Sequence, residues 1–154
     1  MVESEAFSTR TAAGRLLTLL VVGFLPWTII LVNGQFTFVF SFGLVNTNPF
    51  HLTNLYDYLT QFTLGLPRSL QAWPASTLLY IGALVSAATG FTGHEDERLT
   101  GGLLVFAGGA QFYLTVGLIA SLGTRVFPLG MIALWTVAWW GYGPALKRIF
   151  RHDE

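Results

Sequence analysis

Long apolar stretches dominate the chain and alternate with short polar ones. Four apolar stretches are long enough to cross about 30 Å of hydrocarbon as helices: 14–33, 73–92, 99–123 and 126–146. Another apolar-rich stretch has apolar side chains at every second position, as a β-strand does: Phe36, Phe38, Phe40 and Phe42. The pattern predicts an all-α membrane protein with four transmembrane helices and one long loop that contains a short strand or hairpin.

The first apolar stretch permits two interpretations. In the first, residues 14–33 form a transmembrane helix with a kink near Pro26, because proline removes a backbone hydrogen bond, and the polar residues 1–13 form a tail. In the second, the stretch is the core of a cleaved signal peptide, with Val32-Asn33-Gly34 as the cleavage site. The helix is favoured because the apolar core is long and the cleavage site is poor.

The loop, residues 34–72, is expected to hold two elements. A strand or hairpin spans 36–45 and is followed by Asn46-Thr47-Asn48-Pro49, whose residue types favour turns. A helix spans 54–65 and lies flat on the bilayer surface, because its apolar side chains recur on one face. An alternative for the Phe-rich part is a re-entrant element that dips into the bilayer.

Small and polar residues inside the predicted spans indicate how the helices pack. Gly82, Ser86 and Gly90 lie four residues apart on the second span, and such stripes let helices approach closely. Gly108 thins the surface of the third span, where Gln111 is the most polar side chain expected in lipid. Gln111 either lines a polar pathway or hydrogen-bonds to a neighbouring helix, and the second role is commoner for a single amide.

Composition agrees with a membrane protein. Of the 154 residues, 53% are hydrophobic and 10% are charged, and the mean hydropathy is +0.57, above the usual range of soluble domains. The formal net charge is zero, so the chain lacks the basic field that a nucleic-acid partner requires. The absence of cysteine excludes disulfides and thiolate metal sites.

The positions of the cations predict the orientation. With four spans, six cations lie on the side of the termini and two on the side of the loop: Arg10, Arg15, Arg98, Lys147, Arg148 and Arg151 against Arg68 and Arg125. Cytoplasmic loops carry the excess of Lys and Arg. Both terminal tails, residues 1–13 and 147–154, and the turn 93–98 are therefore predicted in the cytoplasm of a multi-pass cell-membrane protein, with the loop outside.

Two groups of residues are candidates for chemistry. The predicted ligand-contacting residues of the loop combine apolar rings, an imidazole, a carboxylate and phenols: Phe38, Phe40, His51, Asn54, Tyr56, Asp57 and Tyr58. Helix capping by Asn54, a favourable helix dipole at Asp57 and interfacial tyrosines explain most members separately. The turn residues 94–97, His-Glu-Asp-Glu, offer cation ligands, but consecutive residues rarely converge on one ion, so a solvated charged turn is expected.

Missing motifs argue against catalysis. No Asp, Glu, Lys, Arg or His lies inside the apolar cores of the predicted spans, although proton relays and ion-coupled transporters depend on such residues. The sequence contains no HExxH, Walker or GxGxxG motif. We therefore predict no catalytic residue, no cofactor and no metal ion. An enzyme that uses His51 and Asp57 is the least favoured hypothesis.

Several short motifs are spread over nearly the whole chain: residues 40–49, Gly65-Leu66-Pro67, Ala72-Trp73-Pro74, Gly93-His94-Glu95-Asp96 and Ala138-Trp139-Trp140. With these motifs the chain resembles a family of small haloarchaeal multi-pass membrane proteins that has no assigned function. The resemblance implies a haloarchaeal source, and the excess of seven Arg over one Lys agrees with it. It implies no catalytic residues.

The sequence thus predicts a non-enzymatic accessory or assembly subunit of the cell membrane. Its expected partners are the lipid bilayer and either another membrane protein or further copies of the chain, and no nucleic acid is expected. The alternative is a module that binds or transports a lipid or another apolar small molecule through the outward loop.

Overall fold

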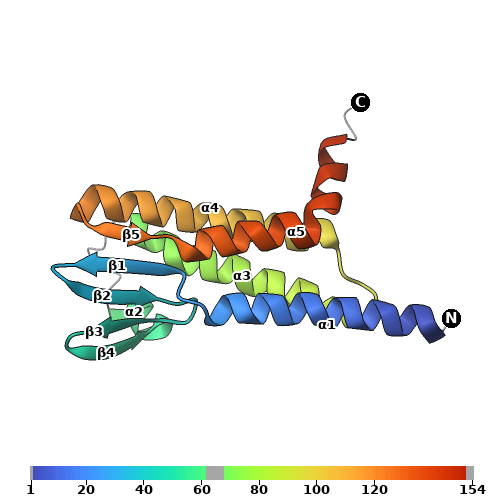
Figure 1. Cartoon of the computed structure of the whole chain (residues 1–154), viewed down its shortest axis with the longest axis horizontal. Coiled ribbons are helices and arrows are strands. Elements are labelled where there is room, and N and C mark those ends of the chain that lie inside the picture. The colour runs from blue at the N-terminus through green and yellow to red at the C-terminus, as the bar shows by residue number, and fades with distance from the viewer. Residues whose placement is uncertain (1, 62–67, 152–154) are drawn as a thin grey trace.

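The protein combines a layer of helices with a five-stranded antiparallel β-sheet (Figure 1). The computed structural model describes residues 2–61 and 68–151. Its helical elements are α1 (Val2–Phe24), α2 (Leu55–Gln61), η1 (Arg68–Gln71), α3 (Ala72–Ala88), η2 (Thr89–Thr92), α4 (Glu97–Leu122) and α5 (Leu129–Arg151), where η marks a 3-10 helix. The strands, in the order in which they pair, are β4 (Phe50–Asn54), β3 (Gly43–Thr47), β2 (Gln35–Val39), β1 (Thr28–Val32) and β5 (Arg125–Phe127).

The prediction of an all-α fold is wrong, because the first apolar stretch changes structure in its middle. Within residues 14–33, α1 ends at Phe24 and β1 begins at Thr28. Pro26 lies between them and cannot donate the backbone hydrogen bond that a continuing helix needs. The residues that follow are rich in β-branched side chains, which favour strands. Part of the predicted first span therefore belongs to the sheet.

The last predicted span, 126–146, also loses residues to the sheet. Strand β5 pairs with β1, and α5 begins only at Leu129. Within the described part of the chain, two helical segments are long and apolar enough to cross a membrane: Ala72–Thr92 and Glu97–Ser121. The prediction of four such helices is therefore wrong. Hydropathy could not reveal this, because apolar residues suit a buried strand as well as a membrane helix.

A two-residue turn explains how the chain reverses after β1. Asn33 has a φ of 51° and Gly34 a φ of 78°. Positive φ at both central positions is typical of the type I′ turn, whose twist matches that of a hairpin. Open space surrounds the place that a Cβ on Gly34 would occupy. The backbone conformation, and not crowding, therefore favours glycine there.

The Phe-rich stretch 36–45 contributes to two strands of a hairpin. Strand β2 ends at Val39 and β3 begins at Gly43, where a Cβ would lie 2.9 Å from the carbonyl oxygen of Thr53 on β4. Glycine therefore permits the close approach of these strands. Helix α2 follows β4, and residues 62–65 of the predicted interfacial helix lie outside the described residues.

One face of the sheet is buried against helices. Its cluster joins residues of β1 and β2 to residues of α2, α3 and α4: Ile30, Val39, Tyr58, Trp73, Leu114 and Leu118. The sheet extends from the end of α1 and lies beside α4, so that it continues the helical layer (Figure 1). The opposite face of the sheet carries apolar side chains that remain exposed, among them Leu52 and Phe127.

Trp27 fixes the joint between α1 and the sheet. Its side chain is fully buried, its ring centroid lies 5.1 Å from that of Tyr80 on α3, and its indole N–H donates to the Val22 carbonyl (2.9 Å). Its backbone N–H donates to the Val39 carbonyl (2.7 Å), and its own carbonyl accepts from the N–H of Gly130 (2.6 Å). One residue thus connects α1, β2, α3 and α5.

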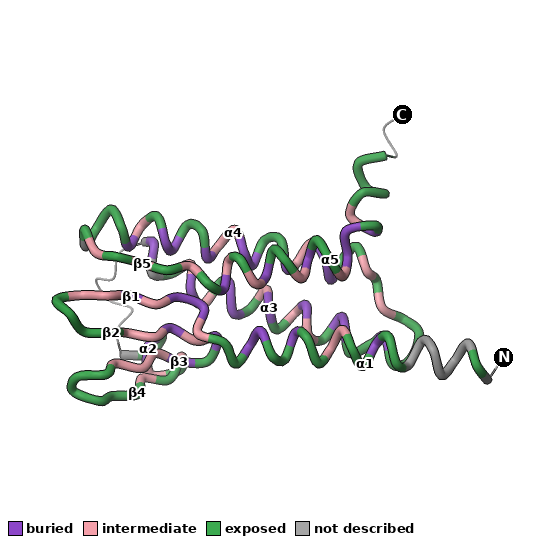
Figure 2. Tube along the Cα trace, viewed as in Figure 1, coloured by how far each residue is buried: buried purple, intermediate pink, exposed green. Residues whose placement is uncertain are grey.

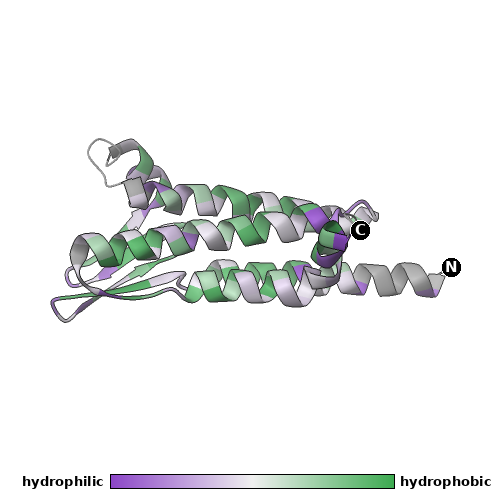
Figure 3. Cartoon of the chain, turned by 90° about the horizontal axis from the view of Figure 1, so that it is seen from above, coloured by the Kyte–Doolittle hydropathy of each residue, from purple (hydrophilic) through white to green (hydrophobic). Residues whose placement is uncertain are grey.

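Helices α3 and α4 bury polar side chains, and all four long helices expose apolar ones. Figure 2 shows the burial along the chain and Figure 3 its hydropathy. The buried polar residues of these helices include Ser76, Thr77, Ser86, Thr100, Gln111 and Thr115. Large exposed apolar residues on the same helices include Leu17, Leu78, Val85, Phe106, Phe112 and Trp139. Buried polar groups and extended apolar surfaces are the informative departures from the pattern of a soluble domain.

Candidate functional site

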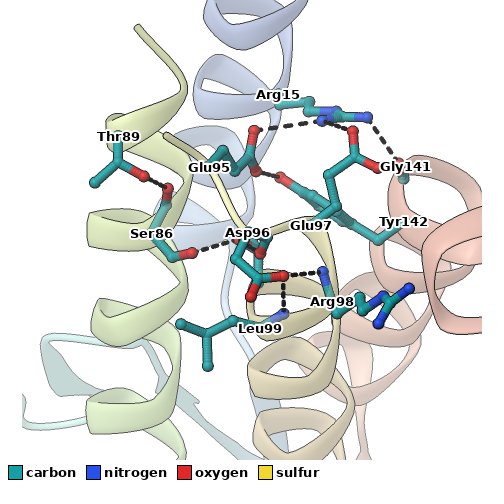
Figure 4. Close-up of polar contacts among 11 residues, drawn as sticks. Arg15, Ser86, Thr89, Glu95, Asp96, Glu97, Arg98, Leu99, Gly141 and Tyr142 are labelled. Atoms are coloured by element: carbon teal, nitrogen blue, oxygen red, sulfur yellow. Dashed lines mark hydrogen bonds and ion pairs between the residues drawn. The ribbon is translucent and has the colours of Figure 1, made fainter. Parts of the chain in front are cut away.

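Four polar side chains meet at the end of the helical layer that is farthest from the sheet (Figures 1 and 4). Arg15 comes from α1, Glu95 from the turn before α4, Glu97 from the first turn of α4 and Tyr142 from α5. We call these four residues the clasp. The sequence predicted a solvated charged turn here, but the side chain of Glu95 is only 8% exposed.

Local structure places the two glutamates. Gly93 ends η2 in the left-handed conformation, with a φ of 73°. Asp96 caps α4, because its carboxylate accepts hydrogen bonds from the N–H groups of Arg98 (3.0 Å) and Leu99 (3.3 Å). The turn between these two fixed points directs Glu95 towards α1 and α5 (Figure 4). The exposed acidic residue of the turn thus forms the cap, while its neighbour enters the clasp.

Arg15 occupies the centre of the clasp. Its Nη1 donates to Oε1 of Glu97 (2.8 Å) and Oε2 of Glu95 (3.3 Å), and its Nη2 donates to the Gly141 carbonyl (3.4 Å). The hydroxyl of Tyr142 donates to Oε1 of Glu95 (2.8 Å), and the Arg15 guanidinium lies 4.9 Å from the Tyr142 ring centroid. These contacts tie α1, the start of α4 and α5 together.

The two carboxylates stabilise the guanidinium of Arg15. Burial alone would lower the pKa of Arg15, but the hydrogen bond with Glu97 and the charges of Glu97 and Glu95 outweigh it, so the pKa is raised. The nearly buried carboxylate of Glu95 receives donors from Arg15 and Tyr142. These donors offset the cost of removing the carboxylate from water.

The polar side chains of the clasp are bonded mainly to one another. A cavity of about 330 Å³ lies beside it and is lined by Thr11, Ala12, Arg15, Gly90, Gly93, Glu95 and Glu97. Both carboxylates are already bonded to Arg15. Within residues 2–61 and 68–151, no three His, Asp or Glu residues are grouped so as to hold a metal ion. The arrangement joins helices.

The structure brings two of the predicted loop residues together as a helix cap. The Asp57 N–H donates to Oδ1 of Asn54 (2.8 Å), and Nδ2 of Asn54 donates to Oδ2 of Asp57 (2.9 Å). These bonds close the first turn of α2, as helix-capping side chains do. Tyr56, on the same helix, is 74% exposed. The Asp57 carboxylate and the Asn54 amide are thus hydrogen-bonded to each other.

The other predicted loop residues lie apart. Tyr58 is buried against Trp73, with ring centroids 4.7 Å apart, and burial raises the pKa of its hydroxyl. His51 is exposed on β4. Phe38 stacks on a neighbouring ring of β2, Phe36, and Phe40 stacks on Phe42, with centroid distances of 6.2 and 5.2 Å. The titratable groups and the Phe rings therefore do not form one pocket.

The residues predicted to pack helices on α3 and the following η2 differ in how tightly they pack. A Cβ on Gly82 would make only ordinary contact, at 3.4 Å. The Ser86 hydroxyl forms a 2.6 Å hydrogen bond with the Thr100 hydroxyl of α4. A Cβ on Gly90 would lie 2.9 Å from Oε2 of Glu95. The stripe thus contacts α4 at its centre and the clasp at its end.

The two predicted packing residues of α4 contact α5 and the sheet. A Cβ on Gly108 would collide with the indole of Trp135, so glycine permits α4 and α5 to approach closely. Gln111 is fully buried, and its Oε1 accepts a hydrogen bond from the hydroxyl of Thr28 on β1 (3.2 Å). The described residues offer no hydrogen-bond partner to the Gln111 Nε2. Its contact is with a strand and not with another helix.

Sequence reasoning missed Arg15 and Tyr142 as partners of Glu95. They lie 80 and 47 residues away from it in the chain, so no local motif connects them. One signal was available. In a layer of antiparallel helices, a residue near the end of one apolar stretch lies beside the turns that connect other stretches at the same end of the layer. Arg15 stands at such a border, and Tyr142 lies close to the cationic end of its stretch.

Comparison with known proteins gives a family and no activity. Residues 2–152 match the sequence profile of a family described as a domain of unknown function, DUF8050. No curated protein matches the chain. The matched region includes the helical layer, the sheet and the clasp together. Any role must therefore be inferred from the geometry.

Proposed function

Since the chain belongs to the DUF8050 family, whose function is unknown, we propose a role from its geometry: it is an integral membrane protein that acts as a non-enzymatic accessory or assembly subunit. The helical layer lies in the bilayer, with α3 and α4 as crossing helices. The sheet lies at one membrane surface and the clasp at the other. We also propose the haloarchaeal source and the cell-membrane location that the sequence implied.

The distribution of polar and apolar side chains carries this proposal. On α4, Gln111 is 0% exposed while Phe106 is 70% exposed. In water, a surface of this kind would be costly, since large exposed apolar patches mark interaction or membrane surfaces. In lipid, the same arrangement is favourable, because apolar side chains face the acyl chains and polar groups bond to each other.

The dimensions and charges of the layer suit a bilayer. The segment Ala72–Thr92 has 21 residues and Glu97–Ser121 has 25, so each exceeds about 30 Å as a helix. No charged residue lies between 72 and 92 or between 99 and 121. The start of α1 and the end of α5 both lie at the clasp end (Figure 1). We propose that this cation-rich end faces the cytoplasm.

The outer face of the sheet supports an accessory role. The register places five apolar side chains in one row across this face: Leu52, Val45, Phe38, Ile29 and Phe127. Leu52 is 55% exposed and Phe127 is 49% exposed. We propose that this row docks an apolar surface of a partner protein. The role is non-enzymatic because the ionisable side chains of the clasp are engaged in joining helices.

Purification from the native membrane tests this proposal. The tagged chain should stay in the membrane after alkaline carbonate extraction and copurify in mild detergent with a partner in fixed stoichiometry, detected by mass spectrometry. The double variant Phe50→Ser/Leu52→Ser should lose that partner, because both side chains are exposed on the sheet. Tyr56→Ser, at another exposed aromatic residue, should retain it. Release by carbonate, or a lone chain, would contradict the proposal.

The second candidate is a module that binds a lipid or another apolar small molecule at the sheet. The stacked pairs Phe36–Phe38 and Phe40–Phe42 favour it, because aromatic rings offer a large apolar contact area. This role predicts that a defined lipid copurifies with the chain and is lost when Phe38 and Phe40 become Ser. A protein partner without such a lipid would decide against it.

A further inference from the structure

A second hollow lies on the flank of the clasp, between α1 and α5. It has a volume of about 260 Å³, and the residues that line it include Gly14 and Thr18 of α1 and Val137, Trp140 and Gly141 of α5. This volume is slightly below that of common small-molecule pockets, about 300–1,000 Å³. We call this hollow the α1–α5 crevice. Its size suits one slender apolar chain.

The walls of the α1–α5 crevice are open and apolar. Nothing lies within 4 Å of the place that a Cβ would take on Gly14 or on Gly141. The hydroxyl of Thr18 donates to the Gly14 carbonyl of its own helix (2.8 Å), so its polar group is already bonded. Val137 and Trp140, which is 86% exposed, supply apolar surface. Such walls favour methylene groups over water.

Two arginines of α1 lie towards the clasp end of the crevice: Arg15, which is one of its lining residues, and Arg10. Arg10, Gly14 and Thr18 follow each other at intervals of four on α1, so they share one face of the helix. Arg10 is exposed, and Arg15 is engaged by the clasp. Along the crevice, the cations at the clasp end are followed by apolar walls. This order matches an amphiphile in which an anionic headgroup is followed by an apolar tail.

We propose that the α1–α5 crevice binds one phospholipid with an anionic headgroup. The headgroup phosphate lies beside Arg10, and one acyl chain lies between the helices along Val137 and Trp140. Charge complementarity selects the anionic headgroup, since each Lys or Arg near a membrane surface favours anionic lipid. The inference rests on the proposed function, because only a membrane-embedded layer presents this crevice to acyl chains.

Native mass spectrometry of the detergent-solubilised full chain tests this binding, with dioleoylphosphatidylglycerol and dioleoylphosphatidylcholine as probes. The wild type should retain phosphatidylglycerol in preference to phosphatidylcholine. Gly14→Leu/Gly141→Leu should fill the crevice and lose the bound phosphatidylglycerol. The matched control Gly102→Leu/Gly109→Leu, at two α4 glycines with equally open space, should retain it. Arg10→Gln should lower phosphatidylglycerol affinity about fivefold, as expected for one cation near the headgroup.

Each outcome of these experiments either supports or overturns the lipid site. Equal retention of the two lipids by the wild type, or undiminished phosphatidylglycerol on the filled variant, would overturn the inference. If the filled variant does not fold, Arg10→Gln decides in its place, and unchanged affinity there would overturn the inference. Carbonate extraction of the same membranes separates the two proposals: release of the wild type refutes membrane integration, whereas a retained protein without phosphatidylglycerol refutes only the lipid site.

Discussion

The two ends of the helical layer are held together by different kinds of contact. At the clasp end, Arg15 bonds to two carboxylates and Tyr142 donates to one of them. At the sheet end, Trp27 is fully buried among apolar groups, and its backbone bonds to β2 and α5. The first joint depends on matched charges, and the second depends on volume and backbone geometry. Substitutions should therefore act on the two joints for different reasons.

Trp27→Ala should have the largest effect. Removing a fully buried indole leaves a cavity at the place where α1, β2, α3 and α5 meet. Phe or Trp to Ala changes in a core cost about 3–5 kcal/mol. Thermal unfolding in detergent, followed by circular dichroism, measures the loss. The control Trp140→Ala removes an 86% exposed ring and should change the midpoint little. Equal changes of the midpoint in the two variants would show that Trp27 does not hold the elements together.

Arg15→Ala should come next, at about 3 kcal/mol. The change leaves the nearly buried carboxylate of Glu95 without its cation, and breaking a buried pair from one side typically costs about 3–5 kcal/mol, here reduced by partial exposure. Arg98→Ala is the matched control, because Arg98 is an exposed arginine in the first turn of α4, next to Glu97. The same unfolding assay applies. A midpoint as little changed as that of the control would show that the clasp does not stabilise the fold.

A pair of tyrosine substitutions sharpens the comparison. Tyr142→Phe removes a donor to the Glu95 carboxylate, and hydrogen bonds to charged groups contribute about 1.5–3 kcal/mol. Tyr80→Phe, beside Trp27, removes a donor to the Leu19 carbonyl, which also belongs to the hydrogen-bond ladder of α1, so about 0.5 kcal/mol is expected. Unfolding midpoints of both variants should fall in that order. The reverse order would contradict the assignment of charge to one joint and volume to the other.

Local signals in the sequence predicted part of this structure. The apolar segments that form α3 and α4 are long and uninterrupted, and they alone among the described helices meet the requirements of a membrane span. The cap of α2 by Asn54 and Asp57 was also readable, because its residues lie three positions apart. The alternation of Phe residues indicated strand structure, and Phe36 and Phe38 do belong to β2.

The sheet and the clasp required information that hydropathy does not hold. Apolar residues before and after Pro26 look alike on a hydropathy scale, although they form a helix and then a strand. The Asn33-Gly34 pair was a local signal for the hairpin of β1 and β2, but the favoured interpretation ended the first transmembrane helix there and the alternative placed a cleavage site there. The clasp joins residues as far apart as Arg15 and Tyr142, which are 127 positions apart, so only the packing of the helices brings them together.

The joint at Trp27 also has a mechanical consequence. Helix α1 passes into β1 through only Leu25, Pro26 and Trp27, and hydrogen bonds hold the backbone of Trp27 on both sides. A joint of this kind transmits torque and does not act as a hinge. The helix from Arg15 to Phe24 is therefore a lever of about 14 Å, and a load that tilts the sheet is delivered to the ion pairs at its far end.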